Sequence, residues 1–127
     1  MAQETRKHSK LSASTCERWW NCPGSVRVCA SIKPEANVYM AEGTVAHSLA
    51  ETVLRGERQH AEQAIGTIYT QDGFEVEVTE EMADSVQDYV DYIQGLLVGM
   101  SGVLIRFEEK IELTEVNTVL FGSPDCV

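Results

Sequence analysis

The feature that most constrains the fold is an apolar stripe between residues 80 and 100. Apolar side chains recur there every three or four positions, which predicts one long amphipathic helix. Thr79 precedes the stripe as an N-cap, and Glu80 and Glu81 follow where the helix dipole favours negative charge. Gly99 begins the glycine-containing segment that ends the helix. The stripe comprises Met82, Val86, Tyr89, Val90, Ile93, Leu96, Leu97 and Met100.

A second helical periodicity and a hairpin are predicted before this helix. The helix runs from Val38 to Leu54, and Gly56 has the place of the residue that ends it. Its buried face is predicted to comprise Ala41, Val45, Ala46, Leu49, Ala50, Val53 and Leu54. Thr67–Val78 alternates in hydropathy around Gln71-Asp72-Gly73, which predicts a β-hairpin. The polar segment 57–66 fits either a loop or a frayed helix.

Shorter elements are predicted at the two ends of the chain. Ser14 lies three residues before Glu17, the spacing of a capping box, and predicts a helix from Thr15 to Asn21 that Pro23 and Gly24 end. A further turn of helix is predicted over residues 25–30.

Alternating hydropathy predicts strands over Val103–Leu113 and Thr118–Phe121, paired antiparallel. We therefore expect an α+β fold in which helices pack on a small mixed or antiparallel sheet. The length of 127 residues predicts one domain over 11–127, after a flexible basic tail over 1–10.

Charge is distributed unevenly along the chain, whose formal net charge is −10. Residues 1–33 hold six basic and two acidic residues, and the remainder holds four basic and eighteen acidic residues. Any DNA contact is therefore expected in the N-terminal third, whereas the acidic remainder suits a basic protein partner. The chain shows neither an apolar run of membrane-spanning length nor a secretory signal, so we expect it in the cytoplasm with no membrane partner.

Two groups of residues are candidates for metal chemistry. Gly43, His47 and Glu51 follow at four-residue intervals and share one helix face. The imidazole and carboxylate can reach one divalent cation, or the glutamate can orient the histidine, or the histidine is incidental to a surface helix. Asp125, in Gly122-Ser123-Pro124-Asp125 after a strand, is placed either to bind magnesium or to form a turn.

Aromatic and basic residues near the N-terminus are candidates for nucleic-acid binding. Trp19 and Trp20 lie beside Arg18 and, further along, Arg27, and such groups stack on bases and neutralise phosphates in single-strand binders. The alternative is that one tryptophan fixes the N-terminal helix to the core. Four cysteines (Cys16, Cys22, Cys29 and Cys126) are expected to be free thiols in a reducing compartment, and their spacing fits neither zinc ribbons nor ferredoxins.

Several motifs together resemble the N-terminal part of phage-associated RecB-like nucleases of the PD-(D/E)XK superfamily. The segments that carry the resemblance are Leu11 to Ser14, Glu17 to Trp19, Asn21 to Ser25, the Ala-Glu-Gly-Thr-x-x-His run Ala41 to His47, the helix Met82 to Met100, the strand Ile105 to Leu113, and Gly122 to Asp125. The resemblance implies a truncated PD-(D/E)XK core and a metal-dependent DNA exonuclease.

In the nucleases that the chain resembles, residues matching His47 and Asp125 bind the catalytic magnesium or manganese. Glu51 and Glu42 are further candidate ligands. The family's Glu/Asp-x-Lys strand follows the aspartate, whereas this sequence ends at Val127 and its Glu108-Glu109-Lys110 precedes Asp125. We therefore expect a catalytically incomplete site.

The resemblance also bears on the cysteines. Some relatives hold an iron–sulfur cluster through one N-terminal and three C-terminal cysteines. Cys22 has the place of the first, but the trio is absent and Cys126 cannot replace it, so we expect no cluster. Cys16 and Cys29 are expected to pack as small apolar residues.

Two other functions remain open. A non-catalytic acidic phage protein could bind and inhibit a nucleic-acid-binding complex in the host cytoplasm, as DNA-mimicking anti-CRISPR or anti-restriction proteins do. A homodimer could instead form through an exposed sheet edge near residues 118–127.

Overall fold

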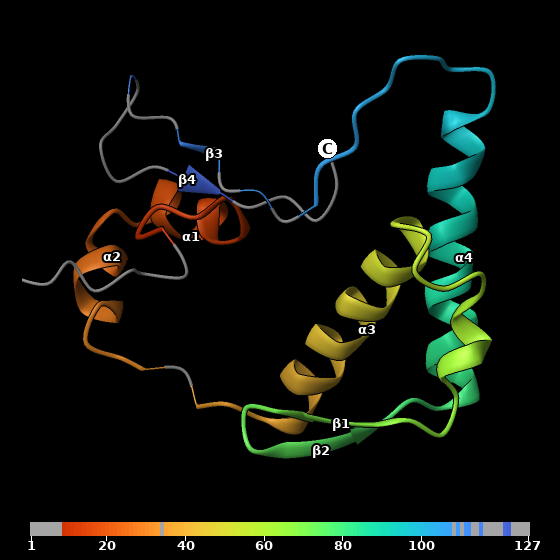
Figure 1. Cartoon of the computed structure of the whole chain (residues 1–127). Helices are drawn as coiled ribbons and strands as arrows, with labels where there is room; N and C mark the ends of the chain where they lie inside the picture. The colour runs from red at the N-terminus through yellow and green to blue at the C-terminus, as the bar shows by residue number, and fades with distance from the viewer. Residues whose placement is uncertain are drawn as a thin grey trace, which may run out of the picture. The chain divides into compact units, whose positions relative to one another are not determined.

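The computed structural model describes residues 9–33, 35–107, 109, 111–112, 115 and 121–122, and it divides into two compact units (Figure 1). Unit 1 combines residues 1–34 with 105–127, and unit 2 comprises residues 35–104. Helices and antiparallel strand pairs occur together, which confirms the predicted α+β class. The single domain predicted over 11–127 stays a prediction, and most of the predicted tail lies outside the described residues.

Unit 2 is built from two long helices, a short helical turn and a hairpin (Figure 1). In chain order these are α3 (Val38–Leu54), the 3-10 helix η2 (Ala61–Ala64), β1 (Ile68–Gln71), β2 (Phe74–Glu77) and α4 (Glu80–Leu97). The two helices pack against each other, and η2 and the hairpin close the remaining sides of the core. Among the described helices, none has both the length and the apolar content of a membrane span.

Helix α3 begins and ends at side-chain and backbone signals in the sequence. Asn37 Oδ1 accepts the Met40 N–H at 3.0 Å and caps the first turn. At the other end Gly56 has a φ of +78° and donates to the Val53 carbonyl at 3.0 Å, while Glu57 donates to the Thr52 carbonyl at 3.0 Å. This pair of hydrogen bonds is a Schellman motif, which confirms the predicted role of Gly56.

The predicted hairpin is confirmed, with Asp72 and Gly73 as its two-residue turn. Both residues have positive φ, 51° and 85°, as a type I′ turn requires. Tyr69 pairs with Val76 and faces the core, whereas the outward face carries Ile68, Thr70, Glu75 and Glu77.

Helix α4 is confirmed, but its apolar stripe is buried over only half its length. Thr79 Oγ1 accepts the Met82 N–H at 3.2 Å, so the predicted N-cap is correct. The fully buried residues are Ala83, Val86 and Val90, whereas Tyr89, Leu96 and Met100 are exposed. Full burial is confined to the N-terminal half of α4, and the elements that pack against this helix are α3 and η2.

The core of unit 2 consists of small side chains. Only alanine, valine and one leucine are fully buried, which lets the backbones of the helices approach closely. The buried residues are Ala41, Val45, Leu49, Ala50, Val53, Ala61, Ala64, Val76, Val78, Ala83, Val86 and Val90. Helix η2 is held on α4 because Gln87 Oε1 accepts the Ala61 N–H at 2.9 Å. The sequence of residues 57–66 fitted either a loop or a frayed helix. The structure shows the short 3-10 helix η2 within this segment, with Ala61 and Ala64 buried.

Unit 1 contains shorter elements. These are the 3-10 helix η1 (Ala13–Thr15), α1 (Cys16–Asn21), α2 (Gly24–Cys29), β3 (Ile111–Glu112) and β4 (Phe121–Gly122). The pairing Ile111↔Gly122 and Glu112↔Phe121 confirms the predicted antiparallel pair.

Two predictions outside the core of unit 2 are wrong. Ser14 does not form a capping box, because the chain enters α1 through η1 and the N-cap is Thr15, which makes no side-chain capping bond. The Ser14 hydroxyl instead lies 3.2 Å from that of Ser12. Residues 103–106 form no strand, since alternating hydropathy needs a partner backbone and the described residues provide none there. Of the second predicted strand, residues 118–120 lie outside the described residues.

Candidate functional site

Helix α3 holds His47 on its exposed face, away from the core of unit 2. Val45 and Leu49, two residues to either side, are buried, so the imidazole lies on the opposite side of the helix. Glu51 follows four residues later, so its carboxylate shares a face with His47. Glu51 is half-buried. The predicted pairing of His47 with Glu51 on one helix face is therefore what α3 shows.

The Glu51 carboxylate already has a partner at the C-terminal end of α3. Arg55 Nε lies 2.7 Å from Oε1 of Glu51, and Nη2 of the same guanidinium lies 2.6 Å from that oxygen. Pairs of this kind, four residues apart on a helix, stabilise it by about 0.3–0.5 kcal/mol. Because both contacts use Oε1, the second carboxylate oxygen is the one suited to a metal ligand.

The other predicted metal ligands are not gathered around His47 in the described part of the chain. Glu42 is exposed and lies five residues before His47, about 140° around the helix axis, so its carboxylate is on another face. Asp125 lies outside the described residues, as do Glu108 and Lys110. Among the residues that the structure describes, no group of three or more histidine, cysteine, aspartate or glutamate side chains could hold a metal ion.

The donor set of α3 fits part of a metal site. An imidazole and one carboxylate oxygen, a turn apart, suit manganese, and magnesium prefers oxygen ligands together with bound water. Two protein donors are too few to fix either ion, so a carboxylate from elsewhere is needed.

The two tryptophans of α1 differ in their contacts. Trp19 is half-buried, and its Nε1–H donates to the Ser12 carbonyl at 3.0 Å. Trp20 is 75% exposed and meets the Trp19 ring edge-on, with centroids 6.2 Å apart. Trp19 thus fixes α1 to the segment before it, and Trp20 presents the larger surface for stacking on a base.

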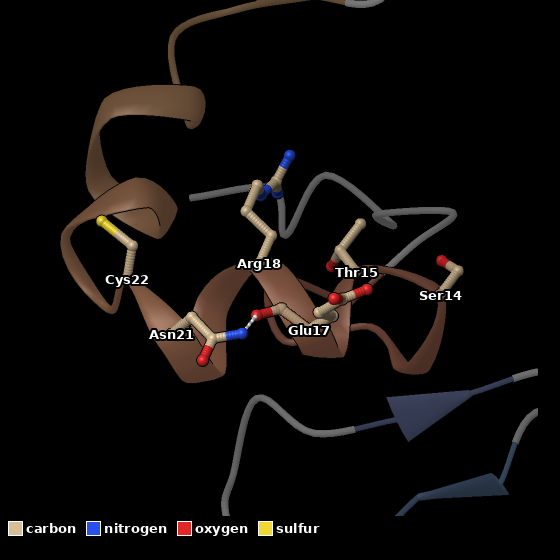
Figure 2. A pocket seen from close by; sticks show the side chains of 6 residues that line it. All are labelled: Ser14, Thr15, Glu17, Arg18, Asn21 and Cys22. Carbon is tan, nitrogen blue, oxygen red and sulfur yellow. Dashed lines mark hydrogen bonds between the residues drawn. The ribbon is translucent and has the colours of Figure 1, made fainter.

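Arg18 lies on a different face of α1 from Trp20, because residues two apart on a helix point in roughly opposite directions. Figure 2 shows Arg18 at a pocket along α1 that neither tryptophan lines. The lining residues are Ser14, Thr15, Glu17, Arg18, Asn21 and Cys22. Arg27 is exposed on α2. The four predicted nucleic-acid-binding residues therefore all lie in unit 1. Arg18 and Trp20 are on different faces of α1, and Arg27 is on α2, so the four do not share one helix face.

The cysteines described by the structure are free thiols: Cys16, Cys22 and Cys29. Cys16 is exposed, so the prediction that it packs as a small apolar residue is wrong, because its side of α1 faces solvent. Cys29 is half-buried, and Cys22 is exposed beside the pocket of Figure 2. Cys126 lies outside the described residues.

The two units differ in net charge, and nearly all of the negative excess lies in unit 2. Unit 2 contains thirteen acidic residues and two basic residues, Arg55 and Arg58. Every one of its carboxylates except that of Glu51 is on an exposed residue. Unit 1 contains eight basic and seven acidic residues. The acidic character of the protein is therefore a property of unit 2.

A family model described as "Protein of unknown function (DUF2800)" matches residues 8–127. The chain belongs to this family, and the match includes both α1 and the histidine-bearing α3. No solved structure matches the chain.

Proposed function

We propose that this chain provides part of the metal site of a RecB-like, metal-dependent DNA nuclease of phage or mobile-element origin. The observation that carries the proposal is the position of His47. It lies on the exposed face of α3, one turn before Glu51, while the opposite face of the same helix forms the core. The order of the segments around α3 supports the proposal, since it agrees with the nucleases that the chain resembles.

In this proposal His47 and the second oxygen of Glu51 bind magnesium or manganese, and Asp125, which lies outside the described residues, is a further ligand that the resemblance implies. The bound ion would activate a water molecule and polarise the phosphodiester. Unit 1 supplies the DNA contacts, because it holds most of the basic residues and the exposed Trp20.

The experiment that tests the proposal is a calorimetric titration of manganese into the purified chain and two histidine variants. We expect His47→Ala to weaken manganese binding by at least about tenfold, as loss of a metal-site group does. His60→Ala is the matched control, since His60 is also an exposed histidine of unit 2 and lies outside α3. Equal manganese affinity of the two variants would overturn the proposal.

A nuclease assay on linear single- and double-stranded DNA accompanies the titration. Any cleavage by the wild-type chain in manganese should disappear in His47→Ala and persist in His60→Ala. Cleavage that survives in both variants would place the catalytic metal elsewhere and contradict the role of α3.

The separation of charge favours a second candidate function, binding of unit 2 to a basic nucleic-acid-binding protein. Twelve exposed acidic residues within seventy residues form a surface that such a protein would attract over distances of about 10 Å at moderate salt. We expect the chain to displace duplex DNA from a basic DNA-binding protein with EDTA present, and more weakly as salt is raised. Displacement that requires manganese would contradict this candidate.

A further inference from the structure

Helix α4 has three stripes along its length, of which only one faces the core. The core stripe contains Ala83, Val86 and Val90. Tyr92 and Leu96, one turn apart, form a second stripe and are 66% and 53% exposed, with Tyr89 at its border. Two apolar side chains so exposed on one helix face form a surface that a partner can cover.

The third stripe of α4 is acidic and runs beside the apolar pair. Its residues recur at three- and four-residue intervals on one face, and all are exposed: Glu81, Asp84, Asp88 and Asp91. Asp88 lies one turn before Tyr92, so the acidic stripe borders the apolar stripe. Helix α4 contains no lysine or arginine at all, and the Gln87 Nε2–H donates to Asp91 Oδ1 at 2.8 Å.

From these stripes we infer that the outer face of α4, defined as Tyr92, Leu96 and the acidic stripe, is a docking surface for a basic amphipathic helix of a partner protein. The inference rests on the second candidate function and names its contact surface. The apolar residues from Tyr89 to Leu96 span two turns, about 10 Å. A partner helix with apolar side chains at i, i+4 and i+7 beside lysine or arginine matches both stripes.

Charge decides which occupant fits this face. In a second copy of unit 2 the only basic residues are Arg55 and Arg58, so pairing two α4 helices would place acidic stripes near each other. Like charges so placed oppose association. A partner helix with a row of cations removes this repulsion and covers Tyr92 and Leu96 at the same time.

The test uses a fluorescently labelled synthetic peptide that forms a helix with leucines at i, i+4 and i+7 flanked by lysines. A scrambled peptide of the same composition is its control. We expect the patterned peptide to bind the whole chain more tightly than the scrambled one, by anisotropy titration, and to bind more weakly as salt is raised. Titrations of protein variants then locate the contact.

The double variant Tyr92→Ala with Leu96→Ala should weaken binding by at least about tenfold, as loss of central apolar contacts does. Asp84→Asn with Asp88→Asn should weaken it and reduce its salt dependence. The matched controls lie on the outward face of the hairpin: Ile68→Ala, which is also an exposed apolar residue, and Glu75→Gln with Glu77→Gln. These controls should leave the affinity within about twofold, since surface changes away from a contact have small effects.

The outcomes separate the docking surface from the function on which it rests. If the patterned peptide binds but the hairpin variants weaken it as much as the α4 variants do, unit 2 attracts cations generally and the α4 surface is overturned. If neither peptide binds at low salt, both the surface and the second candidate function fail. If sedimentation shows self-association that Tyr92→Ala with Leu96→Ala abolishes, the occupant is a second copy and the proposed partner is wrong.

Discussion

The two units differ in how their helices are stabilised. In the described part of the chain, every fully buried apolar side chain belongs to unit 2, and the buried residue of unit 1 is Ser9. The helices α3 and α4 of unit 2 have 17 and 18 residues and side-chain caps, whereas α1 and α2 have six residues each and no such cap. Short helices are marginal by themselves. The long helices of unit 2 are therefore stabilised by their own caps and a shared core, whereas the short uncapped helices of unit 1 depend on contacts beyond their own residues.

The largest expected effect is on the core of unit 2. Leu49 is 3% exposed, so Leu49→Ala should lower the free energy of unfolding by about 2–5 kcal/mol. The control is Val28→Ala in α2, because Val28 is 69% exposed and its loss should change stability by less than about 0.5 kcal/mol. Urea unfolding followed by circular dichroism measures both. A comparable loss for Val28→Ala would mean that unit 1 has a core as tightly packed as that of unit 2.

The next effect is on two glycines with different backbone conformations. Gly56 has a φ of +78° and open space around its Cα, so Gly56→Ala has only the conformational penalty, about 1–2 kcal/mol. Gly24 begins α2 without a positive φ and also has open space. There, Gly24→Ala should leave stability unchanged or raise it by up to about 1 kcal/mol.

Thermal unfolding of the two glycine variants gives the sign of each change. If Gly24→Ala is as destabilising as Gly56→Ala, the positive φ of Gly56 is not the cause of its penalty. The Schellman motif at the end of α3 would then contribute nothing that distinguishes it from α2.

The sequence predicted those parts of the fold that are determined by neighbouring residues. Thr79 capped α4 as expected, and Gln71-Asp72-Gly73 formed the turn, because both depend on hydrogen bonds and dihedral angles within a few residues. The extent of burial along the apolar stripe of α4 could not be predicted in the same way, since burial depends on which elements lie opposite. Periodicity shows that a helix has an apolar face but not how much of that face is covered, and Leu96 is exposed for this reason.

The candidate site was predictable to the same extent. The spacing of His47 and Glu51 placed them on one face, because a helix fixes that relation locally. The Arg55 partner of Glu51 was missed, although its position four residues after the glutamate is a recognisable signal. Asp125 lies outside the described residues, so its role as a ligand stays a prediction.

The smallest expected effect concerns the Glu51–Arg55 pair. It tests whether α3 provides one metal ligand or two. Arg55→Ala should lower the free energy of unfolding by about 0.3–0.5 kcal/mol, because both contacts are partly exposed. If Glu51 is a metal ligand, loss of the guanidinium charge beside its carboxylate should also tighten manganese binding at the second oxygen by about twofold, the factor that corresponds to this energy.

The matched control is Arg58→Ala, because this substitution removes the same positive charge from unit 2. The Arg58 guanidinium donates to the Tyr69 hydroxyl at 3.4 Å and not to Glu51. Calorimetric titration of manganese compares the two variants. A tighter affinity only in Arg55→Ala shows that the arginine and the metal compete for one carboxylate. An equal increase in both variants shows that manganese senses the net charge of unit 2, and Glu51 is then not a ligand, so α3 would contribute His47 to the metal site and not a pair of donors.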